Sequence, residues 1–248
     1  MKKFGLIGHP IAHSLSPALF KAAYDGKYAY DLIEGEDFET SYRRFIEEYD
    51  AINVTAPFKE AAFAKADILS EECASTGATN LLVKTPEGIK AYNSDFLGVR
   101  MWLSEVTEDL KGVKILIVGL GGAGKAAAAA AESLGMDVIR MNRTVRDSRT
   151  LPLDKFRECL READIMIYNI PAAIPELKEL PDSDFNEDKP KLILEANYKD
   201  PSLRETMESF GSKAVYTGGE TWLLYQAMTG YKILTGEKPD LTKMSDVL

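Results

Sequence analysis

The sequence predicts an α/β protein, and three observations lead to this fold class. Strand-like apolar segments alternate with helix-like segments along most of the chain, which is typical of mainly parallel sheets covered by helices. A glycine-rich turn at 119–124 directly follows one apolar run and directly precedes an alanine-rich run. About 110 residues come before this strand–turn–helix unit, so a separate α/β block is expected ahead of it.

The elements of the first block are predicted from local patterns. Pro17 suits the first position of a helix, and Ser16 suits its N-cap. The segment 86–88, Pro-Glu-Gly, suits the turn of a hairpin. Strands are therefore expected at 4–8, 28–33, 51–55, 79–84 and 89–92, and helices at 17–24, 38–49, 60–69 and 96–106.

The second block continues the alternation. Gly135 suits the end of the helix that follows the glycine turn, and Gly218 and Gly219 interrupt the pattern before the last helix. Because the last helix could cross back to the first block, the domains are expected at 1–97 with 219–248, and at 98–218. Strands are expected at 114–118, 137–141, 165–169, 191–195 and 214–216, and helices at 125–135, 156–162, 202–210 and 222–235.

The glycine turn has the chemistry of a phosphate cradle. Gly119 and Gly121 allow the backbone to turn sharply and approach a pyrophosphate, and Gly124 allows the helix to pack against the strand. Gly122 and Ala123 complete the run at the helix N-terminus, where N–H groups and the helix dipole favour anions. A tight structural turn is the alternative. A strand and a helix in register around the turn favour a Rossmann-type dinucleotide-binding domain.

The next strand indicates which dinucleotide is bound. An acidic residue about 20 residues after the glycine turn would hold the ribose hydroxyls of NAD. The chain instead has Asn142, Arg143 and Thr144, followed by Arg146 and Arg149. A guanidinium can bind a 2′-phosphate that a carboxylate would repel, so NADP is favoured over NAD. The alternative is a solvated basic loop.

Composition argues against several classes of function. A chain of 248 residues with 45% hydrophobic content can bury a good core, and the net charge of −9 argues against nucleic acid and anionic membranes as partners. No apolar run approaches the roughly 18 residues of a membrane span.

Cys73 and Cys159 lie far apart, which suits the cytoplasm. His9 and His13 have helical zinc spacing, but Pro10 disfavours a helix there, so no metal is expected.

Four polar clusters lie at predicted strand ends. Ser14 and Ser16 can donate to a carboxylate, although helix capping by Ser16 is the simpler interpretation. Thr55 and Lys59 follow a strand and flank Pro57, and Lys59 could transfer a proton to or from a hydroxyl unless it is an ordinary surface lysine.

The other two clusters are 77–80 and 93–95. Asn80 can bind a hydroxyl with a donor and an acceptor. Asp95 could orient Lys59 and accept from the same hydroxyl, and it could also cap a helix before Phe96. Each cluster alone is a weak signal.

Together the clusters resemble the motifs of the shikimate dehydrogenase family, in the same order and over nearly the whole chain. That family shows H-S-x-S-P, N-V-T-x-P-x-K, G-A-x-N, N-T-D, G-x-G-G-A-G, N-R-T and a late M-L-x-x-Q. The corresponding segments here are 13–17, 53–59, 77–80, 93–95, 119–124, 142–144 and 222–226.

The resemblance implies a substrate-binding catalytic domain at 1–97 and 219–248 and an NADP-binding domain at 98–218. It implies reversible reduction of 3-dehydroshikimate to shikimate, with Gly219 among the cofactor-binding residues. Separately, a monomer or weak homodimer is expected, because the sequence shows no obvious exposed apolar stripe left over. The implied roles are carboxylate binding by Ser14, Ser16 and Tyr198, ring-hydroxyl binding by Thr55, Asn80 and Gln226, and catalysis at C3 by Lys59 and Asp95.

The chain departs from the family pattern in four places. Ser94 replaces the threonine of N-T-D, 169–171 reads Asn-Ile-Pro in place of N-A-T, and Thr221 and Trp222 replace glycine and methionine. The region 147–156 is short for this fold, as if a helix were missing. Two alternatives stay open: a quinate/shikimate dehydrogenase that uses NAD, and a non-catalytic protein that senses a dinucleotide.

Overall fold

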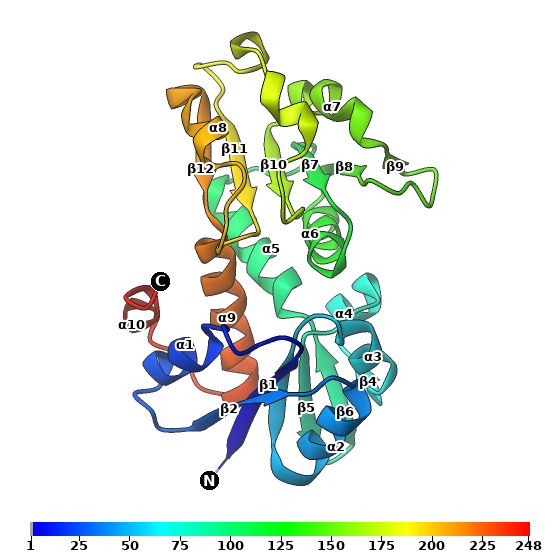
Figure 1. Ribbon diagram of the computed structural model, residues 1–248, viewed down its shortest axis with the longest axis vertical. Coiled ribbons are helices and arrows are strands. Elements are labelled where there is room, and N and C mark those ends of the chain that lie inside the picture. Colours follow the sequence, from blue (N-terminus) through cyan, green and yellow to red (C-terminus); the bar gives the residue numbers. More distant parts are fainter. Residues whose placement is uncertain (1) are drawn as a thin grey trace. The chain divides into compact units, whose positions relative to one another are not determined.

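The computed structural model describes residues 2–248 and divides the chain into two compact units (Figure 1). The first unit comprises Met1–Gly98 and Leu224–Leu248, and the second comprises Val99–Leu223. The chain therefore leaves the first unit once and returns to it, and the α/β class with a returning C-terminal helix is confirmed. The assignment of substrate and cofactor to separate domains stays a prediction.

A six-stranded mixed sheet forms the centre of the first unit, in the order β2-β1-β3-β5-β6-β4. β1 pairs in parallel with β2 and β3, whereas β5 is antiparallel to both β3 and β6. The hairpin predicted around 86–88 is confirmed as β5 and β6. The strands are β1 Lys3–Gly8, β2 Ala29–Glu34, β3 Ala51–Val54, β4 Ile68–Leu69, β5 Leu81–Thr85 and β6 Gly88–Tyr92.

The predicted helices of the first unit are present, except that the segment 60–69 is helical only in part. A single helix was expected there, but the helix ends at Ala64, and Ile68 pairs with Lys90 of β6. α4 and α10 have no counterpart in the prediction. The helices are α1 Ser16–Ala23, α2 Phe38–Glu48, α3 Lys59–Ala64, α4 Glu71–Thr76, α10 Leu241–Ser245, and the parts of α5 Ser94–Val106 and α9 Gly219–Thr235 that belong to this unit.

Two glycines bring α9 close to α5 within the first unit. A β-carbon at Gly98 would lie 2.6 Å from the backbone nitrogen of Gln226. A β-carbon at Gly230 would lie 3.1 Å from Oγ of Ser94. Gly98 has no room for a side chain and Gly230 has very little, so the two glycines allow a close contact that places Gln226 beside the start of α5.

The second unit contains a six-stranded, fully parallel sheet in the order β12-β11-β10-β7-β8-β9. This is the strand order of doubly wound dinucleotide-binding domains. Its strands are β7 Lys114–Val118, β8 Asp137–Met141, β9 Thr150–Leu151, β10 Ile165–Tyr168, β11 Lys191–Glu195 and β12 Ala214–Thr217. Its helices are α6 Gly122–Ser133, α7 Phe156–Glu162 and α8 Arg204–Glu208, with short 3₁₀-helices at Leu153–Lys155, Pro175–Glu179, Asp182–Asp184 and Gly211–Lys213.

The connection between β8 and β9 is the irregular part of this sheet. Residues 142–149 join the two parallel strands as bends, a turn and irregular chain. The region 147–156, predicted to be short, contains the two-residue strand β9 and a 3₁₀-helix at Leu153–Lys155 before α7 begins. Elsewhere residues 115–118 of β7 and the whole of β10 are apolar and buried, and α6 packs through its buried alanines. Among residues 2–248, no helix has the length and apolarity needed to cross a membrane.

Candidate functional site

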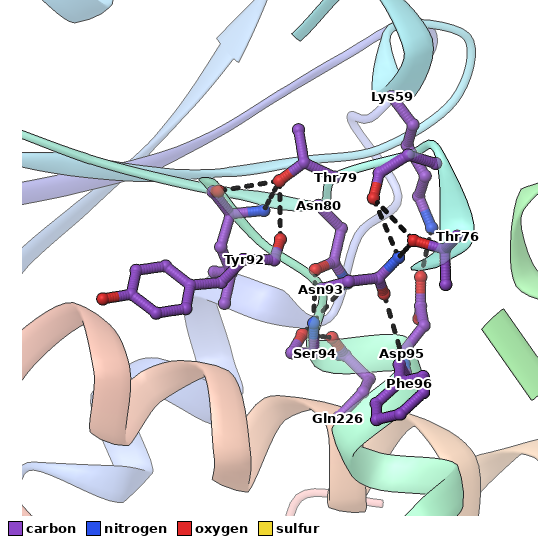
Figure 2. Close-up of polar contacts among 12 residues, drawn as sticks. Lys59, Thr76, Thr79, Asn80, Tyr92, Asn93, Ser94, Asp95, Phe96 and Gln226 are labelled. Carbon is purple, nitrogen blue, oxygen red and sulfur yellow. Dashed lines mark hydrogen bonds and ion pairs between the residues drawn. The ribbon is translucent and has the colours of Figure 1, made fainter. Parts of the chain in front are cut away.

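Lys59 and Asp95 form an ion pair in the first unit, beside other polar residues (Figure 2). Lys59 is the first residue of α3, and Asp95 is the second residue of α5. The side chains are 22% and 9% exposed, so the pair is largely shielded while the ammonium keeps some access to solvent. The start of a helix favours the carboxylate and disfavours the ammonium, so Asp95 compensates for the position of Lys59.

Three buried or half-buried polar side chains form a continuous chain beside this pair (Figure 2). Nδ2 of Asn80 donates to Oγ of Ser94 at 3.0 Å, and that hydroxyl donates to Oε1 of Gln226 at 3.1 Å. The backbone N–H of Ser94 donates to Oδ1 of Asn80 at 2.7 Å. The structure therefore brings Asn80 and Gln226 together through Ser94, for which the sequence indicated no separate role.

Asn93 holds the start of α5. Its Oδ1 accepts from the backbone N–H of Phe96 at 3.2 Å, and its Nδ2 donates to Oγ1 of Thr76 at 3.1 Å. Asn93 is therefore the helix cap that the sequence offered as an alternative role for Asp95, and that alternative is wrong. Since Asn93 performs the capping, the Asp95 carboxylate can pair with Lys59.

The two serines lie in the turn that leads into α1. Oγ of Ser14 accepts from the backbone N–H of Ser16 at 3.2 Å, and both residues are partly exposed. Leu15, and not Ser16, occupies the N-cap position of α1, so the predicted capping by Ser16 is wrong. The hydroxyl of Tyr231, on α9, donates to the carbonyl of Ser16 at 3.0 Å. Burial raises the pKa of Tyr231, so this donor stays protonated.

Thr55 lies directly after β3, next to the end of β1. A β-carbon at Gly8 would lie 2.4 Å from Cγ2 of Thr55, so the absence of a side chain at Gly8 allows Thr55 to pack there. The backbone N–H of Phe58 donates to the carbonyl of Thr55 at 3.0 Å and closes the turn that leads to Lys59. The half-buried Thr55 and Lys59 therefore belong to one short turn, as predicted from Pro57.

The glycine turn of the second unit has the geometry of a phosphate cradle. Gly119 has φ 87°, and a β-carbon at Gly124 would lie 1.9 Å from the carbonyl oxygen of Gly119. Nothing lies within 4 Å of a β-carbon at Gly121, the N-cap of the 12-residue helix α6, so the space in front of the turn is open. Gly122 and Ala123 form the first turn of α6. These features fit a dinucleotide pyrophosphate.

Asn142 connects the end of β8 to the glycine turn. Its Oδ1 accepts from the backbone N–H of Leu120 at 3.3 Å, and its Nδ2 donates to the carbonyl of Thr144 at 3.1 Å. An amide thus stands where a carboxylate would bind the ribose of NAD. Arg143 and Thr144 are exposed beside it, as are Arg146 and Arg149. Exposed guanidinium groups fit a 2′-phosphate, and their assignment to it stays a prediction.

Tyr198 lies in the loop that follows β11, in the second unit. It is half-buried, and burial raises the pKa of its phenol. A β-carbon at Gly219 would lie 2.7 Å from both the carbonyl oxygen of Ala196 and the nitrogen of Tyr198, so Gly219 packs on this loop. The roles of Tyr198 and Gly219 in ligand binding stay predictions.

Glu195, for which the sequence predicted no role, holds the same loop in place. Its carboxylate is fully buried and accepts hydrogen bonds from the N–H and Oγ of Ser202, the N–H of Leu203 and the hydroxyl of Tyr216, at 2.6, 3.0, 3.1 and 2.7 Å. A glutamate at the end of an apolar strand is the signal that could have identified it.

Family models match most of the chain. Residues 6–82 match the shikimate dehydrogenase substrate binding domain. Residues 88–194 match the NAD binding domain of D-isomer specific 2-hydroxyacid dehydrogenases. The two matches fall in the parts of the chain that carry the Lys59 turn and the glycine turn, respectively.

Relatives and solved structures match over nearly the full length. NADP-dependent shikimate dehydrogenases from Staphylococcus aureus and Thermotoga maritima are 32% and 31% identical, over 98% and 93% of this chain and 96% and 92% of their own. The crystal structure of shikimate 5-dehydrogenase from Thermus thermophilus in complex with NADP(H) and shikimate has a TM-score of 0.82 at 27% identity, covering 100% of this chain and 98% of its own. Together with the motifs, these similarities show that the chain belongs to the shikimate dehydrogenase family.

Proposed function

We propose that this protein catalyses the reversible, NADPH-dependent reduction of 3-dehydroshikimate to shikimate. The Lys59–Asp95 ion pair, next to the chain of polar side chains Asn80, Ser94 and Gln226, carries this proposal. A shielded ammonium beside amide groups suits a substrate that has a reacting carbonyl and several hydroxyls. Relatives named as NADP-dependent shikimate dehydrogenases support the assignment.

The residues of the first unit bind and orient the substrate in this proposal. Ser14 and Ser16 donate to the substrate carboxylate, and the partly exposed turn that carries them is held by Tyr231. Thr55, Asn80 and Gln226 bind the ring hydroxyls. These groups have largely fixed positions before substrate arrives, which reduces the cost of ordering them on binding.

Lys59 and Asp95 handle the proton at C3. As the carbonyl is reduced, negative charge builds on its oxygen, and the Lys59 ammonium stabilises and protonates that oxygen. Asp95 orients the ammonium through the ion pair and stabilises its charge. In the reverse direction, a neutral Lys59 amine accepts the hydroxyl proton.

The second unit binds the cofactor. NADPH, when bound, supplies the hydride for this reaction. The N–H groups at the start of α6, Gly122 among them, would hold the pyrophosphate, with Gly121 leaving the approach open. Asn142, Arg143 and Thr144 would bind the 2′-phosphate end.

The cellular compartment and the oligomeric state are proposed from other features of the chain. Cys73 and Cys159 are buried free thiols, which suits the reducing cytoplasm. Burial raises the pKa of Cys73 to about 11, so its thiol stays protonated and unreactive. We expect a monomer or a weak homodimer, a size that light scattering after gel filtration measures directly. A dimer that persists at nanomolar concentration would contradict the expectation of weak association.

Product analysis tests the proposed reaction. Incubation of the purified protein with 3-dehydroshikimate and NADPH should give shikimate and NADP in equal amounts, measured by mass spectrometry and by absorbance. Binding of NADPH without any product would instead support the dinucleotide-sensing alternative. A quinate/shikimate dehydrogenase would, in addition, reduce 3-dehydroquinate at a comparable rate.

A further inference from the structure

In the polar chain of Asn80, Ser94 and Gln226, one hydroxyl lies between two amides. The contacts of this hydroxyl determine which group donates and which accepts in each hydrogen bond. The backbone N–H of Ser94 can only donate, and it donates to Oδ1 of Asn80 at 2.7 Å. This contact fixes the Asn80 carboxamide so that Nδ2, and not the oxygen, faces the Ser94 hydroxyl at 3.0 Å. The Ser94 oxygen is therefore an acceptor toward Asn80.

The single proton of the Ser94 hydroxyl then determines the orientation of Gln226. It is donated to Oε1 of Gln226 at 3.1 Å. In the reverse orientation Nε2 of Gln226 would meet an oxygen that already accepts from Asn80, and the hydroxyl proton would lose this acceptor. Because Ser94 is fully buried, such a loss would carry the cost of an unsatisfied buried group. The Gln226 carboxamide is thus held with its Nε2 edge turned away from Ser94.

We propose that Ser94 is a positioning residue that makes Gln226 a hydrogen-bond donor toward a hydroxyl oxygen of the substrate. This inference rests on the proposed function for the identity of the substrate. The backbone N–H of Ser94 thereby determines which end of each carboxamide, that of Asn80 and that of Gln226, faces the Ser94 hydroxyl. The site then recognises an oxygen that accepts from Gln226 and discriminates against a substrate that lacks it.

Packing keeps Ser94 in this position. A β-carbon at Gly230 would lie 3.1 Å from Oγ and 3.2 Å from Cβ of Ser94, so α9 approaches the serine closely. The family motif at this position, N-T-D, has threonine, which also carries a hydroxyl. A hydroxyl at residue 94 is therefore the property to preserve, and Ser94→Thr is the conservative variant.

Because Ser94 contacts the amides and not the catalytic ion pair, a substitution at Ser94 should change KM and not kcat. Ser94 is bonded to the amides, whereas Lys59 is paired with Asp95. Ser94→Ala should raise the KM for shikimate about tenfold, because Gln226 loses the hydroxyl that donates to its Oε1. The kcat and its pH profile should stay close to those of the wild type. Ser94→Thr should restore KM, and Ser104→Ala, at an exposed serine of the same helix, should have no effect.

A double-mutant cycle identifies the residue through which Ser94 acts. In a Gln226→Ala background, Ser94→Ala should raise KM by less than about twofold, since there is no amide left to orient. Equal effects of Ser94→Ala in the presence and absence of Gln226 would overturn the inference. An unchanged KM in Ser94→Ala, or a loss that Ser94→Thr does not restore, would also overturn it.

A measurement without turnover separates this inference from the proposed function. The side-chain amide signals of Gln226 in a ¹⁵N–¹H spectrum can be assigned by their loss in Gln226→Met. They should move in Ser94→Ala and stay in place in Ser104→Ala. Unmoved signals in Ser94→Ala would overturn the inference even if the enzyme is active. If the wild type does not oxidise shikimate, the proposed function fails, and these signals still show whether the Ser94 hydroxyl contacts the Gln226 carboxamide.

Discussion

The two units hold their predicted site residues in different ways. In the first unit, Lys59, Asn80 and Asp95 are largely buried and bonded to one another or to neighbouring side chains. In the second unit, Gly121 and Gly122 offer backbone groups, and Arg143 is exposed. The first unit therefore presents bonded side chains, whereas the second presents backbone groups surrounded by exposed side chains.

The helix N-termini show the same difference. Oδ1 of Asp37 accepts from the backbone N–H of Thr40 at 2.8 Å and caps α2 in the first unit. The corresponding position of α6 is Gly121, whose lack of a side chain leaves the helix terminus open. A capped terminus contributes to folding, and an open one is available to an anion. Substitutions in the two units should therefore affect different properties.

The largest effect is expected at Lys59. Lys59→Ala should lower kcat about 10²-fold or more, because the proton donor at C3 is lost, while shikimate still binds. Steady-state kinetics together with calorimetric titration of shikimate separates the two effects. Near-normal turnover would remove Lys59 from the mechanism.

A pair of glycine substitutions comes next and separates folding from cofactor binding. Gly124→Ala should destabilise the protein by about 3 kcal/mol, since the added carbon meets the Gly119 carbonyl at 1.9 Å. Gly121→Asp, at a position with open space, should leave the melting temperature near that of the wild type but weaken NADPH strongly, because a carboxylate repels phosphate. Thermal unfolding and fluorescence titration of NADPH measure both. Equal melting temperatures for the two variants would contradict the packing described for Gly124.

Arg143 tests the cofactor assignment more narrowly. Arg143→Ala should weaken the binding of NADPH about tenfold or more and leave the binding of NADH nearly unchanged, because only NADPH carries the 2′-phosphate. Arg161→Ala, which removes an exposed guanidinium from another part of the second unit, serves as the control. Equal losses for NADPH and NADH would reject the 2′-phosphate role.

The smallest effect is expected at Asp37. The backbone N–H of Thr40 holds the pKa of Asp37 below its usual value, so the cap contributes stability above the unfolded-state pKa. That contribution disappears as the pH falls through the lowered folded-state pKa. Asp37→Ala should therefore melt slightly below the wild type at neutral pH, with a difference that shrinks in acid. A difference that is constant between neutral and strongly acidic pH would contradict this account.

Local patterns predicted most helices and strands, because hydrophobic periodicity and the residues that begin or end an element lie within short segments. The strand 191–195 and the helix 156–162 have the predicted bounds. The strand β4 was missed because Ile68 and Leu69 are recognisable only through their pairing with β6. A continuous helical pattern concealed that long-range contact.

In the functional site too, local motifs were predicted from the sequence and long-range contacts were not. Lys59 and Asp95 were predicted together because each belongs to a distinctive motif, and the structure pairs them. The contribution of Tyr231 to the serine turn depends on a contact between residues 215 positions apart, which no local pattern contains. The cap at Asn93 was assigned to Asp95 because both are good N-cap residues and the sequence alone does not fix where α5 begins.

The most direct test of the central claim is the steady-state oxidation of shikimate and quinate by the wild-type protein, each with NADP and with NAD. The highest kcat/KM is expected for shikimate with NADP, with NAD clearly poorer and quinate a weak substrate. Equal or better rates with NAD, or with quinate, would contradict the assignment of a shikimate dehydrogenase that uses NADP. No turnover with any of the four pairs would contradict catalysis by Lys59 and Asp95 altogether.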